Sequence, residues 1–275
     1  ELDHVLKLTG RKKLATVPAS ADVVTALGQM SKNNFDILLV DPIDNERPLV
    51  FSEYSIISKL LDKDPGQYGA FLRSPCLLYC LSGGTTGRNS DLQSLLHVFE
   101  STTFGYAMVH DEIGRIFTIV SVNDLLPLYG RGMLSSNLRV SDVISTPVFS
   151  MSRGSKIIDC IREMTSRKFR KVKLANCQVV ISDKEIFSHL FNHYRLLRMF
   201  KSPQHLLDGT LEDLEGAQVE WIDGKGTLAE AALLMDRSPG KFLMSGSGIV
   251  TPWDLIIKPW RLGSLRISRT IQVGG

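Results

Sequence analysis

The chain has 275 residues, a length that suits two domains of ordinary size better than one small core. Hydrophobic residues make up 43% and charged residues 22%, so the composition is globular and excludes a disordered chain. Lysine and arginine exceed aspartate and glutamate by three, a surplus too small to indicate a nucleic-acid partner by itself. The sequence contains no apolar run of the roughly 18 residues that cross a bilayer and no signal-peptide pattern, so we expect a cytoplasmic protein.

A β-α-β-β-α pattern occurs four times along the chain. Each copy has a short β-prone segment, an apolar-periodic helix, two apolar strands and a closing hydroxyl residue that opens a second helix. The closing hydroxyls are Ser52, Ser121, Ser182 and Thr251, which are 69, 61 and 69 residues apart. This regular spacing predicts four copies of one α/β unit.

The first two copies differ mainly in the segment after their first strand. The first copy is predicted to have a helix over 21–30, strands over 36–40 and 48–52, and a turn over 41–45. The second is predicted to have strands over 77–81, 106–109 and 116–121 and a helix over 91–100. Its glycine-rich stretch 81–90 lacks the Gly-Lys-Ser/Thr ending of a phosphate-binding loop. We therefore expect a flexible insertion there, with Asn89 or Ser90 capping the helix.

The third and fourth copies repeat the pattern. The third is predicted to have strands over 147–151, 172–174 and 179–182 and a helix over 155–164. The fourth is predicted to have strands over 218–222, 241–244 and 248–251 and a helix over 228–235.

Such units expose an apolar sheet face, so they are expected to pair. The stretch 129–137, rich in glycine and serine, interrupts the pattern between the second and third copies. This break predicts a first module over 1–134 and a second module over 135–275. The first would hold repeats at about 4–64 and 70–134, and the second would hold repeats at about 135–200 and 205–262 plus a C-terminal tail.

Two phrases of the repeat carry a family resemblance. They are Leu138–Val148 (LRVSDVISTPV) and Gly114–Leu125 (GRIFTIVSVNDL). They resemble the opening and closing phrases of repeats in the CBS domain family, named after cystathionine β-synthase, and the resemblance covers nearly the entire chain. It implies an α/β (α+β) fold of tandem β-α-β-β-α CBS repeats that pair through their sheets into two Bateman modules, as in a stand-alone prokaryotic or archaeal protein.

The resemblance also implies a ligand. In that family the closing Ser/Thr-x-x-Asp binds a nucleotide, because the hydroxyl meets a phosphate and the carboxylate accepts hydrogen bonds from the ribose hydroxyls. Three copies carry a hydroxyl and a carboxylate at this spacing: Ser121 with Asp124, Thr251 with Asp254, and Ser182 with Glu185. The first copy has Ser55 in place of the carboxylate, so a site there is not expected. The implied ligand is AMP, ADP, ATP or an S-adenosyl compound, with no separate cofactor.

Further pocket residues are implied at the first strand of a repeat and in the loop before its second strand. These are Thr146, Pro147, Val148, Arg170 and Lys171 in the third copy and Lys241 in the fourth. The cations among them suit a phosphate. Arg167 and Lys168, one turn earlier, are more typical of a solvated helix end, where cations offset the helix dipole.

Simpler interpretations stay open beside the nucleotide site. A hydroxyl followed three positions later by a carboxylate is also a capping box, which stabilises a helix whatever the ligand. Clustered basic residues support a nucleic-acid-binding alternative: Arg11, Lys12, Lys13, the run 167–173, Arg195, Arg198, Lys201, Lys258, Arg261, Arg266 and Arg269. A third alternative is a structural or interaction scaffold whose pockets have lost their ligand.

Metal and catalytic sites have weak support. His189 and His193 lie four residues apart, as two metal ligands on a helix can, but the pattern lacks further ligands and predicts ordinary histidines. Cys76, Cys80, Cys160 and Cys177 lack zinc-site spacing and indicate buried thiols in a reducing compartment.

We therefore expect a non-enzymatic sensor without a metal. A nucleotide would favour one relative orientation of the repeats, which an unknown protein effector would read. Association into a homodimer, or pairing of the two modules within one chain, is expected from the apolar helices, and no membrane partner is expected.

Overall fold

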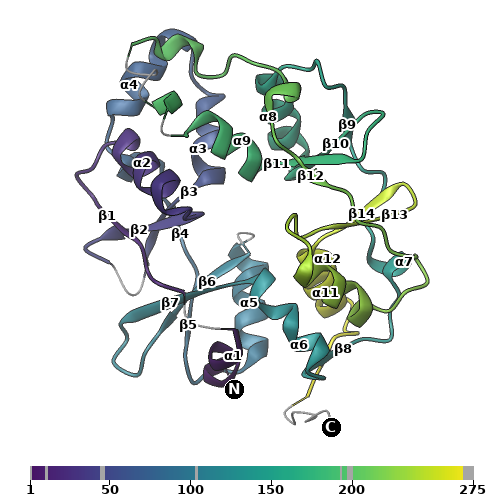
Figure 1. Cartoon of the computed structure of the whole chain (residues 1–275). Coiled ribbons are helices and arrows are strands. Elements are labelled where there is room, and N and C mark those ends of the chain that lie inside the picture. The colour runs from purple at the N-terminus through teal and green to yellow at the C-terminus, as the bar shows by residue number, and fades with distance from the viewer. Residues whose placement is uncertain are drawn as a thin grey trace.

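The computed structural model describes residues 2–9, 12–43, 47–102, 105–192, 194–196 and 201–268. Its four α/β repeats lie at the corners of a ring, with repeats one and two along one side and repeats three and four along the other (Figure 1). Both termini lie at the end of the ring formed by repeats two and four. The predicted α/β fold of four paired repeats is confirmed.

Repeat one follows its sequence pattern closely. It consists of β1 (Thr16–Pro18), α2 (Val23–Asn33), β2 (Ile37–Asp41), β3 (Leu49–Ser52) and α3 (Glu53–Leu60). The α2 helix begins after Asp22, whose carboxylate accepts a hydrogen bond from the Thr25 amide, and ends at Asn34 in the left-handed conformation. Residues 44 and 45 of the predicted turn lie outside the described residues. The link to repeat two contains η1 (Pro65–Gln67), α4 (Tyr68–Arg73) and η2 (Cys76–Tyr79).

Repeat two departs from its prediction at its start. It consists of β4 (Leu81–Ser82), β5 (Thr85–Gly87), α5 (Leu92–Thr102), β6 (Tyr106–His110), β7 (Ile116–Ser121), η3 (Val122–Leu125) and α6 (Pro127–Gly130). Most of the predicted strand 77–81 is the helical turn η2. The glycine-rich stretch is not a flexible insertion, because it carries β4 and β5. Its glycines permit close packing, since a Cβ on Gly83 would lie 1.9 Å from the Met108 side chain.

The predicted cap of α5 was wrong. The Asp91 carboxylate accepts hydrogen bonds from the amide and the hydroxyl of Ser94, at 2.8 and 2.7 Å. Asp91, rather than Asn89 or Ser90, therefore caps this helix.

Repeats three and four keep their predicted helices and hairpins. Repeat three consists of α7 (Val140–Val143), β9 (Ser150–Met151), α8 (Ile157–Arg167), β10 (Lys171–Leu174), β11 (Val179–Ser182) and α9 (Asp183–Leu190). Repeat four, reached through η4 (Pro203–His205) and η5 (Leu211–Asp213), consists of β12 (Ala217–Gln218), α11 (Leu228–Arg237), β13 (Leu243–Ser245), β14 (Gly248–Val250) and α12 (Pro252–Arg261). The first strands of repeats three and four, β9 and β12, are shorter than predicted. The segment that opens each of these repeats pairs with one sheet and then with another.

The opening segment of a repeat crosses from the sheet of its module partner to its own sheet. In repeat two, β4 pairs with β3 of repeat one, and β5 then pairs with β6. In repeat four, β12 pairs with β11 of repeat three, and Trp221 then bridges Met244. In repeat three, Ser145 bridges Ile249 of repeat four before β9 pairs with β10. This exchange of strands joins the two repeats of each module.

Apolar side chains reinforce this pairing between the sheets. In the first module, Ile37, Leu39 and Val50 of repeat one form one cluster with Met108, Ile116 and Ile119 of repeat two. In the second module, Val180 of repeat three forms a cluster with Phe242, Met244 and Ile249 of repeat four. Burial of apolar surface between two sheets is the expected reason that these units pair.

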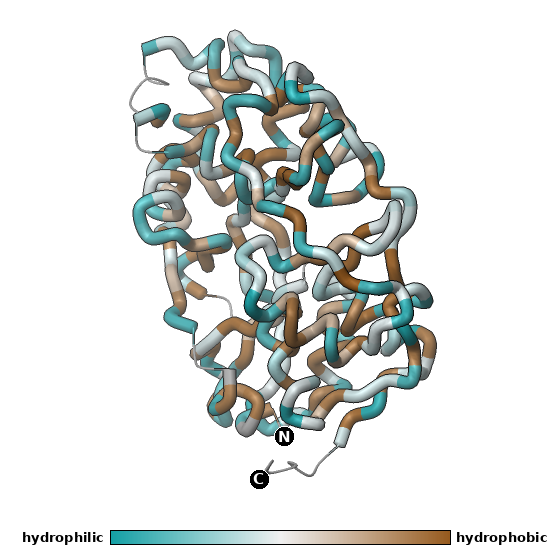
Figure 2. The backbone as a smooth tube through the Cα atoms, turned by 45° about the vertical axis from the view of Figure 1, so that its right-hand side comes forward, coloured by the Kyte–Doolittle hydropathy of each residue, from teal (hydrophilic) through white to brown (hydrophobic). Residues whose placement is uncertain are grey.

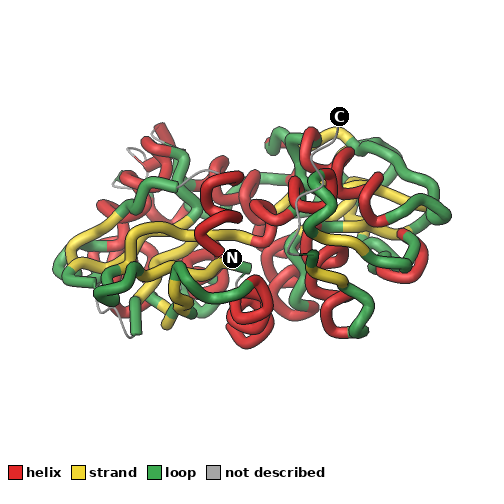
Figure 3. The backbone as a smooth tube through the Cα atoms, turned by 90° about the horizontal axis from the view of Figure 1, so that it is seen from below, coloured by secondary structure: helices red, strands yellow, loops and turns green. Residues whose placement is uncertain are grey.

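Helices join the two modules to each other. One large core contains side chains of repeats one and three, including Phe51 and Phe191, and we call it the one–three seam. The other contains side chains of repeats two and four, including Phe99 and Leu255, and we call it the two–four seam. Figure 3 shows helices gathered between two groups of strands, and Figure 2 shows apolar segments running through the body of the ring. The modules therefore pack together within one chain.

A proline in α12 explains one polar contact across the two–four seam. Pro259 has no amide hydrogen, so the carbonyl of Leu255, four residues earlier, lacks its usual helical donor. The buried hydroxyl of Tyr129 in α6 donates to that carbonyl at 2.7 Å. At the one–three seam, Lys184 of repeat three forms an ion pair with Asp36 of repeat one at 3.0 Å.

Segments near both ends pack on repeats two and four. The helix α1 (Leu2–Thr9) places Leu2, Val5 and Leu6 in the two–four seam. Near the other end, β15 (Arg266–Ile267) pairs with β8 (Leu134–Ser135). No helix in the described part of the chain has the length and apolar character to cross a membrane.

Candidate functional site

All four closing hydroxyls lie where a strand ends and a helix begins. Each of them, Ser52, Ser121, Ser182 and Thr251, forms a capping box with the residue three positions later. The capping interpretation of the motif is therefore confirmed. A carboxylate has about four sites for accepting hydrogen bonds, so the remaining contacts of each carboxylate decide whether a ligand could use it.

In repeat two, one oxygen of the Asp124 carboxylate is open. Its Oδ2 accepts hydrogen bonds from the amide and the hydroxyl of Ser121, both at 2.7 Å, and forms an ion pair with Lys12 at 2.6 Å. Its Oδ1 contacts no polar group of the described residues, and 18% of the side chain is exposed. The geometry leaves this oxygen available to a ligand.

In repeat four, both oxygens of the Asp254 carboxylate are engaged. Oδ2 accepts from the amide and hydroxyl of Thr251, at 2.8 and 2.7 Å. Oδ1 accepts from the Ser145 hydroxyl at 2.9 Å and forms an ion pair with Lys258 at 2.7 Å. Lys258 also donates to the Val143 carbonyl at 2.6 Å, and only 4% of the Asp254 side chain is exposed. This network fastens α12 to the opening segment of repeat three, a structural role that the sequence interpretation did not foresee.

In repeat three, the structure brings the predicted residues together. Glu185 Oε2 accepts from the Ser182 amide at 2.7 Å and from the Ser182 hydroxyl, while Oε1 contacts no polar group of the described residues. Lys171 lies opposite Ser182 in the hairpin. β9 pairs with β10 at Lys173 and Leu174, which leaves Val148 outside the strand pairing. The predicted loop cation Lys171 and the closing pair are therefore neighbours.

The two residues before Val148 lie toward repeat four. A Cβ on Gly248 would lie 2.5 Å from the methyl group of Thr146, and Val148 donates its amide to the Ser247 carbonyl at 3.0 Å. Thr146 and Pro147 therefore lie between the two hairpins of the second module, rather than in the pocket of repeat three alone.

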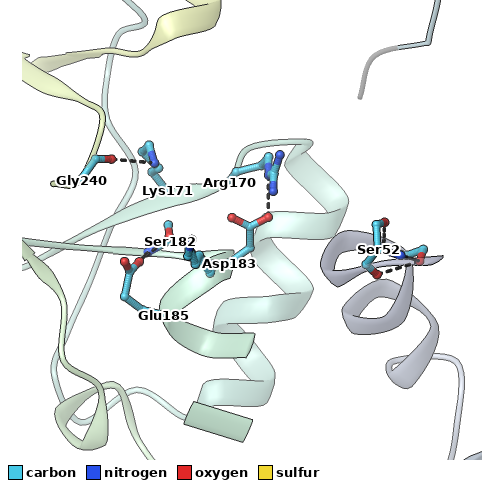
Figure 4. A network of polar contacts seen from close by, with 9 residues as sticks. Ser52, Arg170, Lys171, Ser182, Asp183, Glu185 and Gly240 are labelled. Atoms are coloured by element: carbon cyan, nitrogen blue, oxygen red, sulfur yellow. Dashed lines mark hydrogen bonds and ion pairs between the residues drawn. The ribbon is translucent and has the colours of Figure 1, made fainter. Parts of the chain in front are cut away.

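The two loop cations of repeat three differ in their partners. Arg170 donates to the Asp183 carboxylate at 2.5 Å, whereas Lys171 donates to the Gly240 carbonyl at 3.4 Å (Figure 4). Burial lowers the pKa of Lys171, although nearby carboxylates oppose this shift. Arg170 is already neutralised, so Lys171 is the better partner for a ligand phosphate.

Lys241 has a different role from the one expected. It follows α11 in the left-handed conformation, with φ of 49°. Its ammonium donates to the Asp236 carbonyl and lies 3.5 Å from the Asp236 carboxylate. Lys241 therefore caps the C-terminal end of α11, as cations at helix ends commonly do.

A buried carboxyl group lies near the charged residues of the one–three seam. Glu53 begins α3 and is only 6% exposed, and its carboxyl group contacts no polar group of the described residues. Burial raises its pKa well above the usual value, and the nearby Asp36 and Asp183 raise it further, while Lys184 and Arg170 act in the opposite direction. The folded chain therefore holds the Glu53 proton more tightly than the unfolded chain does.

We expect Glu53→Gln to raise the free energy of unfolding at neutral pH. A raised folded-state pKa gives stability that is fully present below the ordinary glutamate pKa and is lost as pH rises above it. Glutamine keeps the shape without the charge, so at pH 7 the variant should need more denaturant to unfold. The gain should shrink as the pH falls toward the ordinary value of 4.5. A variant less stable than the unmodified chain at pH 7 would contradict this assignment.

Three residues of these sites were missed by sequence reasoning. Lys258 lies four residues after Asp254, a spacing at which helical side chains meet, so the sequence did hold a signal for that pair. Ser145 and Lys12 reach their carboxylates from other repeats. Nothing local in the sequence indicates either contact.

The remaining candidates have ordinary roles where they are described. Several cations of the basic clusters are paired with carboxylates: Arg167 with Glu163, Arg170 with Asp183, Lys258 with Asp254, and Arg261 with Glu100. Burial lowers the pKa of His189, and no group of three or more potential metal ligands occurs within the described ranges. Arg11, His193, Arg198 and Arg269 lie outside those ranges. All four cysteines are free thiols, with Cys76 and Cys160 buried.

Comparison with known proteins identifies the fold. No family model and no curated protein sequence matches the chain. A solved structure from Methanocaldococcus jannaschii, described as a proposed archaeal homolog of g-AMPK, aligns with 93% of this chain and 99% of its own, at a TM-score of 0.77 and 18% identity. The chain has the tandem CBS-domain fold. Its four repeats have the fold of CBS repeats, and the two pairs joined through their sheets are arranged as Bateman modules are.

Two further solved structures align with this chain. An uncharacterized conserved protein from Pyrococcus horikoshii aligns with 90% of this chain and 95% of its own, at a TM-score of 0.51 and 13% identity. A CBS domain protein from Pyrobaculum aerophilum, solved in complex with AMP, aligns with 43% of this chain and 87% of its own, at a TM-score of 0.35 and 17% identity. At these identities the likeness concerns the fold alone, and the last score is too low to bear on the ligand of this chain.

Proposed function

We propose that this chain is a regulatory CBS protein that binds an adenosine-containing nucleotide between paired repeats and acts without catalysis. The observation that carries the proposal is the state of two carboxylates, one in each module. Asp124 and Glu185 each cap a helix with one oxygen and present the other without a partner among the described residues. A carboxylate held in this way can accept hydrogen bonds from the two hydroxyls of a ribose.

The same contacts rank the candidate pockets. Asp254 has both oxygens engaged and is almost fully buried, so a ribose would have to displace Ser145 or Lys258. Ser55 in repeat one has no carboxylate. The proposal therefore places one nucleotide in each module, at Ser121 and Asp124 and at Ser182 and Glu185, with Lys171 beside the second pair.

The position of the repeat-three pocket suggests how binding would be transmitted. Lys184, next to Glu185, forms the ion pair with Asp36 across the one–three seam. A ligand that shifts the start of α9 would act on this contact and so on the relative orientation of the modules. A protein effector that prefers one orientation would then respond to the nucleotide.

We place the module boundary near residue 134 and expect a cytoplasmic setting.

Replacement of the two open carboxylates tests the proposal. Asp124→Ala and Glu185→Ala should each weaken nucleotide binding at their own pocket by about 1.5–3 kcal/mol, or roughly 10–100-fold in Kd, because each removes a charged hydrogen-bond acceptor. Calorimetric titration with AMP and with ATP measures this loss.

Glu230→Ala is the matched control, because Glu230 closes a capping box with Thr227 at the start of α11, away from the closing motifs. It should leave binding unchanged. Equal affinity in the unmodified chain and in both pocket variants would refute the assignment of these carboxylates.

A further inference from the structure

The pocket of repeat two contains a cation that comes from repeat one. The ammonium of Lys12 lies 2.6 Å from Asp124 Oδ2 and 3.0 Å from the Ser121 hydroxyl. It thus contacts both members of the closing pair. About half of the Lys12 side chain, 47%, is exposed, so the ammonium is free to move without disturbing the core.

The backbone of Lys12 itself is held by repeat two. The Lys12 carbonyl accepts a hydrogen bond from the buried Thr118 hydroxyl of β7 at 3.1 Å. On the N-terminal side, α1 packs on η3, the turn that carries Asp124, and Asp3 of α1 forms an ion pair with Arg88 at 2.7 Å. A fixed backbone and a long, half-exposed side chain allow the ammonium to change partners while it stays at the pocket.

We infer that Lys12 makes the pocket of repeat two select an adenosine ligand that carries a phosphate; this inference rests on the proposed nucleotide function. In the free chain the ammonium is paired with Asp124. A ribose that hydrogen-bonds to the Asp124 carboxylate weakens its ion pair with Lys12. A ligand without an anionic group provides no new partner for the Lys12 ammonium. A phosphorylated ligand brings oxygens that the ammonium can bind next to the Ser121 hydroxyl, so the pairing is exchanged instead of lost.

The corresponding cation of repeat four cannot make this exchange. Lys258 lies on the same helix as Asp254 and is held at the same time by the Val143 carbonyl and the Ser145 hydroxyl. The Lys258 ammonium is thus built into the structure, whereas the Lys12 ammonium contacts only Ser121 and Asp124 among the described residues. Phosphate selection through a movable lysine is therefore a property of repeat two.

The test compares AMP with adenosine in a chain whose other pocket is disabled. Glu185→Ala provides this background, so that calorimetry reports the Asp124 pocket. We expect AMP to bind at least about tenfold more tightly than adenosine. Adding Lys12→Met should abolish this preference by weakening AMP, while adenosine binds as well as before or better. Lys12→Arg should restore the preference, and Lys13→Met, which removes the neighbouring exposed lysine, should leave it intact.

The outcomes separate this inference from the function on which it rests. An unchanged AMP-to-adenosine ratio in Lys12→Met would overturn the role of Lys12 and leave nucleotide binding in place. If the unmodified chain binds AMP but the Glu185→Ala chain does not, the nucleotide occupies the second module alone, and the inference fails while the proposed function stands. If no adenosine compound binds the unmodified chain, both fail.

Discussion

Tyr129→Ala is expected to lower the free energy of unfolding by about 3–5 kcal/mol, the usual cost of removing a large buried aromatic side chain. Tyr129 is 4% exposed and lies in the two–four seam, where its hydroxyl also provides the donor that Pro259 denies to the Leu255 carbonyl. The variant removes both the apolar contact and the hydrogen bond between the modules. Chemical denaturation followed by circular dichroism measures the loss.

Tyr129→Phe separates the two contributions. It keeps the ring in the seam and leaves the Leu255 carbonyl without this donor, so it should cost about 1–3 kcal/mol. If both variants unfold at the denaturant concentration of the unmodified chain, the seam between repeats two and four does not contribute to stability, contrary to the ring arrangement of the four repeats.

Asp254→Ala is expected to destabilise the chain by about 3 kcal/mol. Breaking a buried ion pair by removal of one partner typically costs about 3–5 kcal/mol. Lys258 is one-third exposed, which reduces this cost, while the loss of a helix cap adds to it. The change should appear as a lower midpoint of urea unfolding, whether or not a nucleotide is present.

Asp124→Ala is the internal comparison, because the two carboxylates occupy equivalent places in their repeats. Asp124 is more exposed than Asp254, and its partner Lys12 is about half exposed to solvent. Replacement of Asp124 should therefore lower the free energy of unfolding by only about 1 kcal/mol. Lys258→Met added to Asp254→Ala should restore part of the loss by removing the unpaired charge. Equal destabilisation by the two alanine variants would contradict the distinction between a structural carboxylate and an open one.

The repeat and its class could be predicted from the sequence because both depend on local patterns. Apolar residues at helical spacing predicted α2, α5, α8 and α11, and short β-prone runs predicted the hairpins that carry Ser52, Ser121, Ser182 and Thr251. The opening strands were predicted less well. Their residues pair with two sheets in succession, so a run such as 147–151 has a strand composition but forms only the two residues of β9.

The arrangement of repeats in the ring is a long-range property. The one–three and two–four seams bury the apolar faces of amphipathic helices. Such a face can pack against many other helices, so the sequence indicates that each helix packs on another repeat but not on which repeat. The same limit applies to the glycines of 83–87. Glycine composition indicated a loop, whereas close packing against Met108 and Val98 explains Gly83 and Gly84.

The geometry of the candidate site could be predicted in part. The closing pairs could be read from a three-residue spacing, and the pairing of Lys171 with Ser182 follows from the predicted hairpin. The difference between Asp124 and Asp254 could not be read in this way, because it depends on Lys12 and Ser145, which approach from other repeats. Two motifs that look alike in the sequence therefore differ in how much of the carboxylate remains open.

Calorimetric titration of the unmodified chain with AMP, ATP and S-adenosylmethionine is the decisive experiment for nucleotide binding, after mass spectrometry has checked the purified protein for retained ligand. We expect saturable binding of one or two equivalents per chain, tighter for AMP or ATP than for the S-adenosyl compound. Absence of binding by all three, in protein that carries no retained nucleotide, would show that the chain is not a nucleotide-binding regulator.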